Sequence, residues 1–206
     1  MKKNYYPGKF LVFEGLDGSG LSTQSNLLKD FLIKKGYQVV LTKEPTFDSE
    51  AGKRIRKVLD NKEIQEEPKK LQELFAKDRK EHLENLIIPA LKEGKIVISD
   101  RYLFSSLAYG SASGLDFEWL IKINDNFPLP DITFLLKVSP EICLERIKKR
   151  NSERTLFEKK EKFIKAWQIF KTLPGRFENI YLIDGEKPIE EVFEDVKKII
   201  NQKINL

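Results

Sequence analysis

The stretch Lys9-Phe10-Leu11-Val12-Phe13-Glu14 and the loop after it, Gly15-Leu16-Asp17-Gly18-Ser19-Gly20-Leu21-Ser22-Thr23, decide the fold. The first part, a short apolar run rich in aromatic residues, predicts a buried strand, and a helical pattern over Ser22–Lys35 follows the loop. The loop has the spacing of the phosphate-binding motif G-x-x-x-x-G-K-[ST], whose glycines let backbone N–H groups face a phosphate at a helix N-terminus. We therefore expect Gly15–Thr23 to bind phosphate. The alternative is a glycine-rich turn that only packs a helix on a strand.

One position departs from the motif, because Leu21 stands where the lysine belongs. That lysine normally reaches the β- and γ-phosphates, and a hydrogen bond to a charged group contributes about 1.5–3 kcal/mol. Ser22 still occupies the position of a magnesium ligand. Either other cations replace the lysine, or the protein binds nucleotide without transferring phosphate.

Strands and helices alternate along the rest of the chain. This alternation predicts a three-layer, doubly wound α/β fold, with a five-stranded parallel sheet and helices on both faces. The expected strands are Lys9–Glu14, Gln38–Thr42, Lys95–Ser99, Asp131–Lys137 and Asn179–Ile183. The expected helices are Ser22–Lys35, Glu50–Asp60, Pro68–Glu93, Leu103–Ala108, Phe117–Asn126, Pro140–Arg150, Leu156–Thr172 and Pro188–Ile204. The polar stretches Asn61–Pro68 and Lys148–Lys162 are expected to be a loop and a mobile lid.

Length and composition favour one soluble domain over residues 1–206. The net charge is +5, and Lys and Glu alternate along helices rather than forming one block. The sequence has no basic stripe with interleaved aromatics, so no nucleic-acid partner is expected. No apolar run reaches the roughly 18 residues of a membrane span, and the first residues lack a signal-peptide pattern. Cys143 is the single cysteine, so a reducing cytoplasm is the expected location, with Cys143 as a small core residue.

A second candidate site follows the strand Lys95–Ser99, which leads into Asp100-Arg101-Tyr102. In doubly wound folds, ligands bind at the carboxyl edge of the sheet, so this carboxylate and guanidinium are expected near the phosphate loop. We expect Asp100 and Ser22 to hold Mg2+. Taken alone, an Asp-Arg pair is as often a surface ion pair.

Several motifs in sequence order strengthen the case: Phe13-Glu14-Gly15-Leu16-Asp17-Gly18, Lys43-Glu44-Pro45-Thr46, Gly52-Lys53-Arg54-Ile55-Arg56, Leu74-Phe75-Ala76-Lys77-Asp78-Arg79 and Asp100-Arg101-Tyr102-Leu103-Phe104-Ser105-Ser106-Leu107-Ala108-Tyr109. Together they resemble the thymidylate kinase family, from about Lys9 to Arg154. The resemblance implies a phosphate-loop nucleoside monophosphate kinase that uses ATP and Mg2+ to phosphorylate thymidine monophosphate. It also implies a homodimer, through helices packed near Phe75 and Leu107.

The resemblance assigns acceptor-binding roles to particular residues. Phe75 and Arg79, four residues apart on one helix face, look like the pair that stacks on thymine and bonds its edge; alone, Phe75 would read as a core residue. Arg56 and Arg101 match arginines that hold the monophosphate, a task that suits the planar guanidinium.

Four further residues complete the acceptor site that the resemblance implies. Glu44 and Asp17 match acidic residues near the acceptor phosphate and sugar hydroxyl. Tyr109 looks like the tyrosine beneath the sugar, and Ser106 like a residue that helps to read thymine. Gly110 stands where many members carry glutamine, so strict thymine selectivity is left open.

The basic segment around Arg146–Arg154 resembles the family's lid, about residues 146–160. Its alternative interpretation is a solvated helix end. Because Gly18 supplies no arginine after Asp17, the resemblance places the catalytic arginine in the lid, with Arg150 and Arg154 as candidates. Such an arginine can contribute about 10³–10⁵ in rate, enough to cover the missing lysine. The expected catalytic residues are Asp17, Arg101, Arg150 and Arg154.

Two other functions stay open. One is a related kinase with a broader acceptor range, such as deoxyuridylate. The other is a catalytically weak nucleotide-binding protein that lost activity with its lysine. The preferred phosphate donor is also open.

Overall fold

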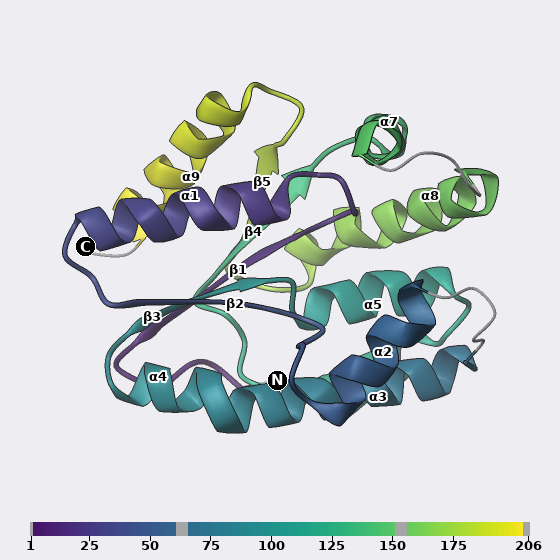
Figure 1. Cartoon of the computed structure of the whole chain (residues 1–206), viewed down its shortest axis with the longest axis horizontal. Coiled ribbons are helices and arrows are strands. Elements are labelled where there is room, and N and C mark those ends of the chain that lie inside the picture. Colours follow the sequence, from purple (N-terminus) through teal and green to yellow (C-terminus); the bar gives the residue numbers. More distant parts are fainter. Residues whose placement is uncertain (1, 61–65, 151–155, 204–206) are drawn as a thin grey trace.

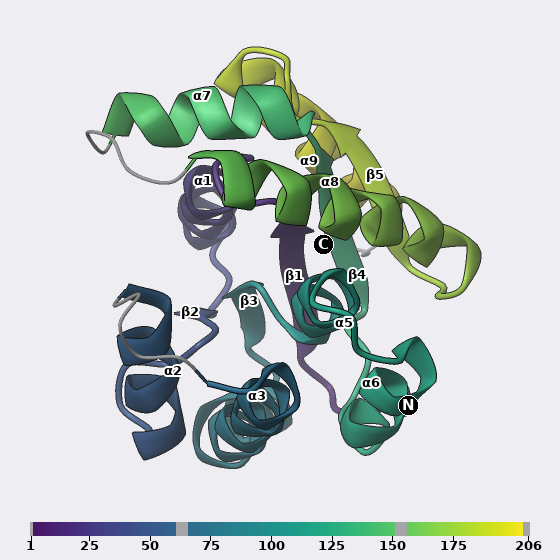
Figure 2. The same cartoon turned by 90° about the vertical axis from the view of Figure 1, so that its right-hand side faces the viewer.

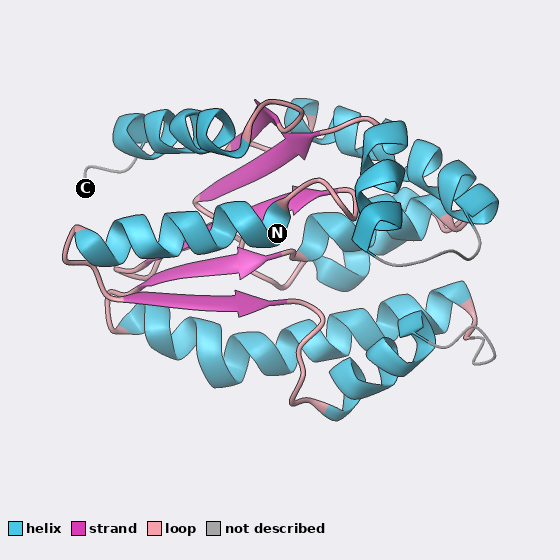
Figure 3. Ribbon diagram, turned by 45° about the horizontal axis from the view of Figure 1, so that its top comes forward, coloured by secondary structure: helices cyan, strands magenta, loops and turns pink. Residues whose placement is uncertain are grey.

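One parallel sheet organises the computed structural model, which describes residues 2–60, 66–150 and 156–203, and at 150 and 156–159 the backbone alone. Its strand order is β2-β3-β1-β4-β5, and the strand arrows of Figure 3 point in one direction. The strands are β1 (Lys9–Gly15), β2 (Val39–Lys43), β3 (Ile96–Asp100), β4 (Ile132–Lys137) and β5 (Ile180–Asp184). The predicted α/β fold with a five-stranded parallel sheet is confirmed.

Helices cover both faces of this sheet (Figure 1). Their bounds are α1 (Leu21–Lys34), α2 (Glu50–Asp60), α3 (Pro68–His82), α4 (Ile88–Lys92), α5 (Leu103–Ala112), α6 (Phe117–Asn124), α7 (Pro140–Arg150), α8 (Leu156–Thr172) and α9 (Ile189–Lys203). Most lie within a few residues of the predicted ranges, and α5 continues four residues past its predicted end at Ala108.

Successive residues of β1 belong to different hydrophobic clusters, because side chains alternate between the two faces of a strand. Phe10 and Val12 face the cluster formed with α4, α5, α6 and α8. Leu11 and Phe13 face the cluster formed with α1 and α9. On the first face, α3, α5 and α6 lie beside one another (Figure 2). Cys143 is fully buried in the first cluster, as predicted.

The helix expected over Pro68–Glu93 is interrupted. Between α3 and α4, residues Leu83–Ile87 form a π-helical segment, and Pro89 follows in the first turn of α4. Proline has no N–H and crowds the carbonyl four residues before it, and a π-bulge accommodates such a break without ending the helix. The sequence interpretation had overlooked this effect of Pro89.

Parallel pairing brings three strand ends together. Asp100 at the end of β3 lies opposite Phe13 of β1 and opposite Lys43 of β2. Since β1 is where the strand order reverses, this edge is the switch point at which doubly wound folds bind ligands.

Within the described residues, no helix is both long and apolar enough to cross a membrane. Of the predicted lid, 146–150 belong to α7 and 156–160 to α8, whereas 151–155 lie outside the described residues, as do 61–65 of the predicted Asn61–Pro68 loop. The prediction of one domain over 1–206 stays a prediction.

Candidate functional site

The phosphate loop joins β1 to α1 through glycines with positive φ. Gly18 has φ 85° and Gly20 has φ 105°. At Gly18, an added Cβ would lie 2.6 Å from the carbonyl oxygen of Cys143 on α7, so a larger residue would push the loop away from that helix. Over the loop lies a pocket of about 170 Å³, lined by Leu16, Asp17, Gly18, Gly20, Leu21, Ser22, Thr23, Lys43, Asp100 and Arg101. The structure thus brings together most of the residues expected to bind ATP.

A polar cluster closes one side of the loop pocket. The Ser22 hydroxyl donates to Asp100 Oδ2 at 2.5 Å, and Lys43 Nζ lies 3.0 Å from the same oxygen. The other oxygen, Asp100 Oδ1, is buried and has no partner among the described residues. A hydroxyl and a carboxylate with a free oxygen are hard oxygen ligands of the kind magnesium prefers, so Ser22 and Asp100 fit the expected metal position.

Leu21 has a packing role rather than a phosphate-binding role. Its side chain is 5% exposed and belongs to the hydrophobic cluster under α1 and α9. A lysine at this position would have to leave the core to reach the loop. The missing lysine is therefore replaced by a packing residue.

Arg101 is held beside the loop in a left-handed backbone conformation, φ 76°. Its Nη1 donates to the Gly15 carbonyl and to Ser105 Oγ, both at 2.8 Å, and its Nη2 pairs with Asp17 Oδ1 at 2.6 Å. Burial alone would lower the pKa of Arg101, but the nearby charges, Asp17 first, raise it above its ordinary value. A strained residue held by several contacts is typical of functional sites, and this one presents a permanent positive charge.

Glu14 holds the turn that carries Arg101 through hydrogen bonds. This fully buried carboxylate accepts from the backbone N–H groups of Tyr102 and Ser105 at 2.9 and 3.0 Å and from Ser105 Oγ at 2.5 Å. Burial raises the pKa of Glu14 to about 7, although Arg101 and these hydrogen bonds oppose the shift. Glu14 therefore fixes the turn after β3 that carries Arg101.

Tyr109 lies on the far side of Asp17. Its hydroxyl accepts from the Asp17 backbone N–H at 3.1 Å, and its ring packs edge-on against Phe163 and Phe170 of α8. Burial raises the pKa of Tyr109, so the phenol stays protonated. The structure thus brings Asp17 of the phosphate loop together with Arg101 and Tyr109, which belong to a distant motif of the sequence.

Glu44 and Arg79 form a buried ion pair. Arg79 is 1% and Glu44 2% exposed, and Arg79 Nε and Nη2 lie 2.9 and 2.8 Å from Glu44 Oε2. Arg79 also donates to Ser106 Oγ at 3.1 Å and to Asn124 Oδ1. His82 contacts Glu44 through Nδ1 at 3.2 Å. The direct ligand contacts expected of Glu44, Arg79 and Ser106 stay predictions, and the described geometry is that of a preorganised support.

Arg56 holds the segment after β2. Its Nε donates to the Thr46 carbonyl at 3.1 Å and its Nη2 to the Pro45 carbonyl, while its guanidinium stacks on Phe47, 3.4 Å from the ring centroid. Asp78, fully buried, accepts from the Thr46 backbone at 2.9 Å. Arg56 and Asp78 together shape the segment that leads from Glu44 into α2.

Phe75 is half-buried on α3 and belongs to neither hydrophobic cluster. This exposure leaves its predicted stacking role available and argues against the core interpretation. At Gly110, an added Cβ would lie 2.7 Å from a methyl carbon of Leu120 and 3.4 Å from Gln72. Neighbouring side chains thus fill the space that a residue larger than glycine would need.

The lid candidates cannot be placed. Arg150 ends α7, but its side chain lies outside the described residues, as does all of Arg154. At the start of the lid, Arg146 donates to the Gly185 carbonyl at 3.1 Å and to the Ser19 carbonyl of the phosphate loop at 3.4 Å. A basic residue of α7 therefore contacts the loop, although neither predicted arginine is described.

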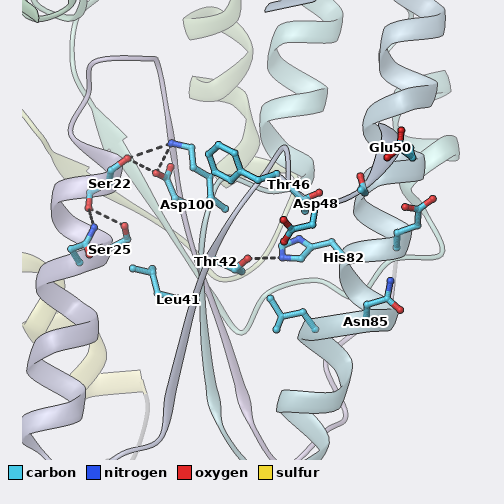
Figure 4. A pocket seen from close by; sticks show the side chains of 16 residues that line it. Ser22, Ser25, Leu41, Thr42, Thr46, Asp48, Glu50, His82, Asn85 and Asp100 are labelled. Atoms are coloured by element: carbon cyan, nitrogen blue, oxygen red, sulfur yellow. Dashed lines mark hydrogen bonds and ion pairs between the residues drawn. The ribbon is translucent and has the colours of Figure 1, made fainter. Parts of the chain in front are cut away.

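A pocket of about 890 Å³ lies beyond the edge strand β2 rather than at the predicted acceptor residues. Figure 4 shows Ser22 and Asp100 at one wall and His82 and Asn85 at another. None of the eight predicted acceptor residues is among those lining it. It meets the loop pocket at Ser22, Lys43 and Asp100, which line both.

Glu14, Lys43 and Asp78 stand within the motifs quoted above but had no predicted role, and Asn124 was not a candidate. The signal for Glu14 and Asp78 was a charged residue beside apolar strand or helix positions, where an unpaired charge would be costly. Asn124 had no such signal, because its partner Arg79 is 45 residues away in sequence.

Comparisons with known proteins show what the chain is similar to. Residues 13–196 match the family model described as thymidylate kinase. A probable thymidylate kinase of Pyrococcus horikoshii is 41% identical over 96% of this chain and 98% of its own. A thymidylate kinase of Caldicellulosiruptor saccharolyticus is 41% identical over 94% and 96%, and one of Desulfotalea psychrophila is 37% identical over 97% and 98%.

Proposed function

Because the chain belongs to the thymidylate kinase family, we propose that it transfers the γ-phosphoryl group of ATP to thymidine monophosphate, giving thymidine diphosphate and ADP. The observation that carries this proposal is the 2.6 Å ion pair between Asp17 of the phosphate loop and Arg101 after β3. It sets a permanent cation beside the phosphate loop, where donor and acceptor phosphates must meet. No covalent intermediate is needed.

The chain contributes positioning and charge. Phosphoryl transfer is catalysed mainly by alignment and electrostatic stabilisation, and preorganised groups serve both. Arg101 holds the acceptor phosphate, while backbone N–H groups of Gly15–Thr23 hold those of ATP. Ser22 and Asp100 would bind Mg2+, which would neutralise negative charge on the phosphates of ATP. Arg150 and Arg154 stabilise the transferring group from the lid.

The base is recognised between α3 and α5. Phe75 offers a half-buried ring for stacking, and Arg79 and Ser106, hydrogen-bonded to each other, offer polar groups for the thymine edge. Arg56 holds the segment beside the acceptor phosphate, and Glu44 fixes Arg79 from behind. Tyr109 lies beside Asp17, where a 2′-hydroxyl would crowd its ring.

The whole chain is proposed to act as one domain, since each hydrophobic cluster combines residues from both halves of the sequence. We further propose a cytoplasmic homodimer without a nucleic-acid partner. Leu107 is fully buried, so the dimer contact would come from the outer faces of nearby helices rather than from Leu107 itself. Light scattering after gel filtration measures the mass, and a monomer would refute this part.

A coupled assay of ADP formation tests the function. Thymidine, deoxyuridine and uridine monophosphates are compared as acceptors, each with ATP and magnesium. Turnover should be fastest with the first and slowest with the third. Comparable rates for the two deoxy acceptors would support the broader kinase, and ADP formation at the no-acceptor background throughout would support the catalytically weak binder.

A further inference from the structure

The phosphate loop lacks its lysine, and one nearby lysine is placed to act instead. Leu21 is buried in the core, so the loop itself presents no side-chain cation. Of the described residues that line the loop pocket, two are cationic, Lys43 and Arg101. Arg101 is bound to Gly15, Ser105 and Asp17, and the proposed function assigns it to the acceptor phosphate.

Lys43 comes from a different strand. It ends β2, opposite Asp100 in the register of β2 and β3. Its ammonium lies 3.0 Å from Asp100 Oδ2 and 3.5 Å from Ser22 Oγ, as the dashed lines of Figure 4 show. The ammonium therefore already stands at the first turn of α1, where phosphate binds.

We infer that Lys43 contacts the β- and γ-phosphate oxygens of ATP and so replaces the lysine that the loop lacks; this inference rests on the proposed kinase function. A cation held by Ser22 and Asp100 would compete with the ammonium for the same oxygens. Lys43 would then exchange Asp100 for phosphate. Its side chain is 41% exposed and flexible, so this exchange needs only rotation about side-chain bonds.

The competing interpretation is purely structural. In that case Lys43 only neutralises the Asp100 carboxylate and keeps the ends of β2 and β3 aligned. The two interpretations predict different relative affinities for ATP and ADP. A lysine on the γ-phosphate distinguishes ATP from ADP, whereas a counter-ion of Asp100 does not.

The experiment compares Lys43→Met with Lys43→Arg. Affinities for ATP and for ADP are measured by calorimetry, with magnesium and with a chelator, alongside kcat for thymidine monophosphate. Lys95→Met is the matched control, because Lys95 is also half-exposed and pairs with one carboxylate, Glu93 at 2.6 Å, at the opposite end of β3. Thermal unfolding checks that each variant is folded.

Lys43→Met should weaken ATP binding in magnesium about 10- to 100-fold, the effect of losing a charge-assisted contact, and ADP binding clearly less. Lys43→Arg should retain most of the preference for ATP, and Lys95→Met all of it. Equal losses for ATP and ADP, or no loss, would overturn the inference. If Lys43→Met does not fold, Lys43→Gln repeats the comparison.

The two proposals fail differently. A wild-type protein that forms no ADP with any monophosphate refutes the kinase function. The ATP-to-ADP affinity ratio, which needs no turnover, still decides the role of Lys43.

Discussion

Replacing Glu14 by glutamine should remove a pH dependence of stability that the structure predicts for the wild type. Glu14 is fully buried, and burial raises its pKa from 4.5 to about 7. Between these two values the folded state binds more protons than the unfolded state, so the free energy of unfolding falls as pH rises. The cost is absent below about pH 4.5 and complete above about pH 7.

The difference between the two pKa values corresponds to about 3 kcal/mol. Glutamine is uncharged at every pH and can still accept from the Tyr102 and Ser105 backbone groups and donate to the Ser105 hydroxyl. The free energy of unfolding of Glu14→Gln, relative to that of the wild type, should therefore rise by about 3 kcal/mol as the pH is raised from about 4.5 to above about 7. Urea unfolding across this range, with unchanged m-values, measures the gain.

Glu73→Gln is the control, because Glu73 is exposed on α3 and its replacement removes no buried charge. Its stability curve should run parallel to that of the wild type. If the Glu14→Gln curve also runs parallel, the reasoning is refuted, because the Arg101 guanidinium would then fully compensate the buried carboxylate.

Four further predictions concern the site. Arg101→Ala should abolish phosphorylation of the monophosphate while changing ATP affinity by less than about tenfold, whereas Arg176→Ala, which removes an exposed ion pair with Glu118, should do neither; equal losses of both functions would refute the assignment to the acceptor. Phe75→Ala should raise the KM for thymidine monophosphate about 10- to 100-fold, the effect of losing an aromatic stack, and unchanged kinetics with a lower Tm would make it a core residue instead. Gly110→Gln should lower the free energy of unfolding by about 1–3 kcal/mol, because the new side chain overlaps Leu120, and a variant of unchanged stability with sharper thymine selectivity would contradict this. Leu21→Lys should raise turnover by less than about tenfold and lower stability by about 2 kcal/mol, since the leucine is buried; a larger rate gain would show that nothing replaces the missing lysine.

The local sequence pattern was sufficient to predict the helices and strands and the phosphate loop. The apolar run before Gly15 and the glycine spacing of the loop are contiguous signals, and both elements formed where they were expected. The sheet edge could be predicted too, because strands alternating with helices leave a parallel sheet as the regular solution. The local pattern did not predict the π-helical segment before Pro89. A proline can either bend a helix or end it, and the sequence alone does not decide between the two.

The local sequence pattern could not predict which residue each charged side chain pairs with. Glu44 and Arg79 are 35 residues apart, and nothing in either motif shows that they bury each other rather than a ligand. The same holds for Asp78, which organises the segment at Thr46 from a different helix.

The sequence by itself determined the fold class, the phosphate loop and the family, because these depend on short-range spacing of glycines, apolar residues and charged motifs. Only the tertiary structure decided which cation stands at the loop. Lys43 reaches Ser22 and Asp100 because parallel pairing sets β2 beside β3, with Lys43 opposite Asp100. Register between strands is a long-range property, so no reading of the loop alone could supply the lysine that its own motif lacks.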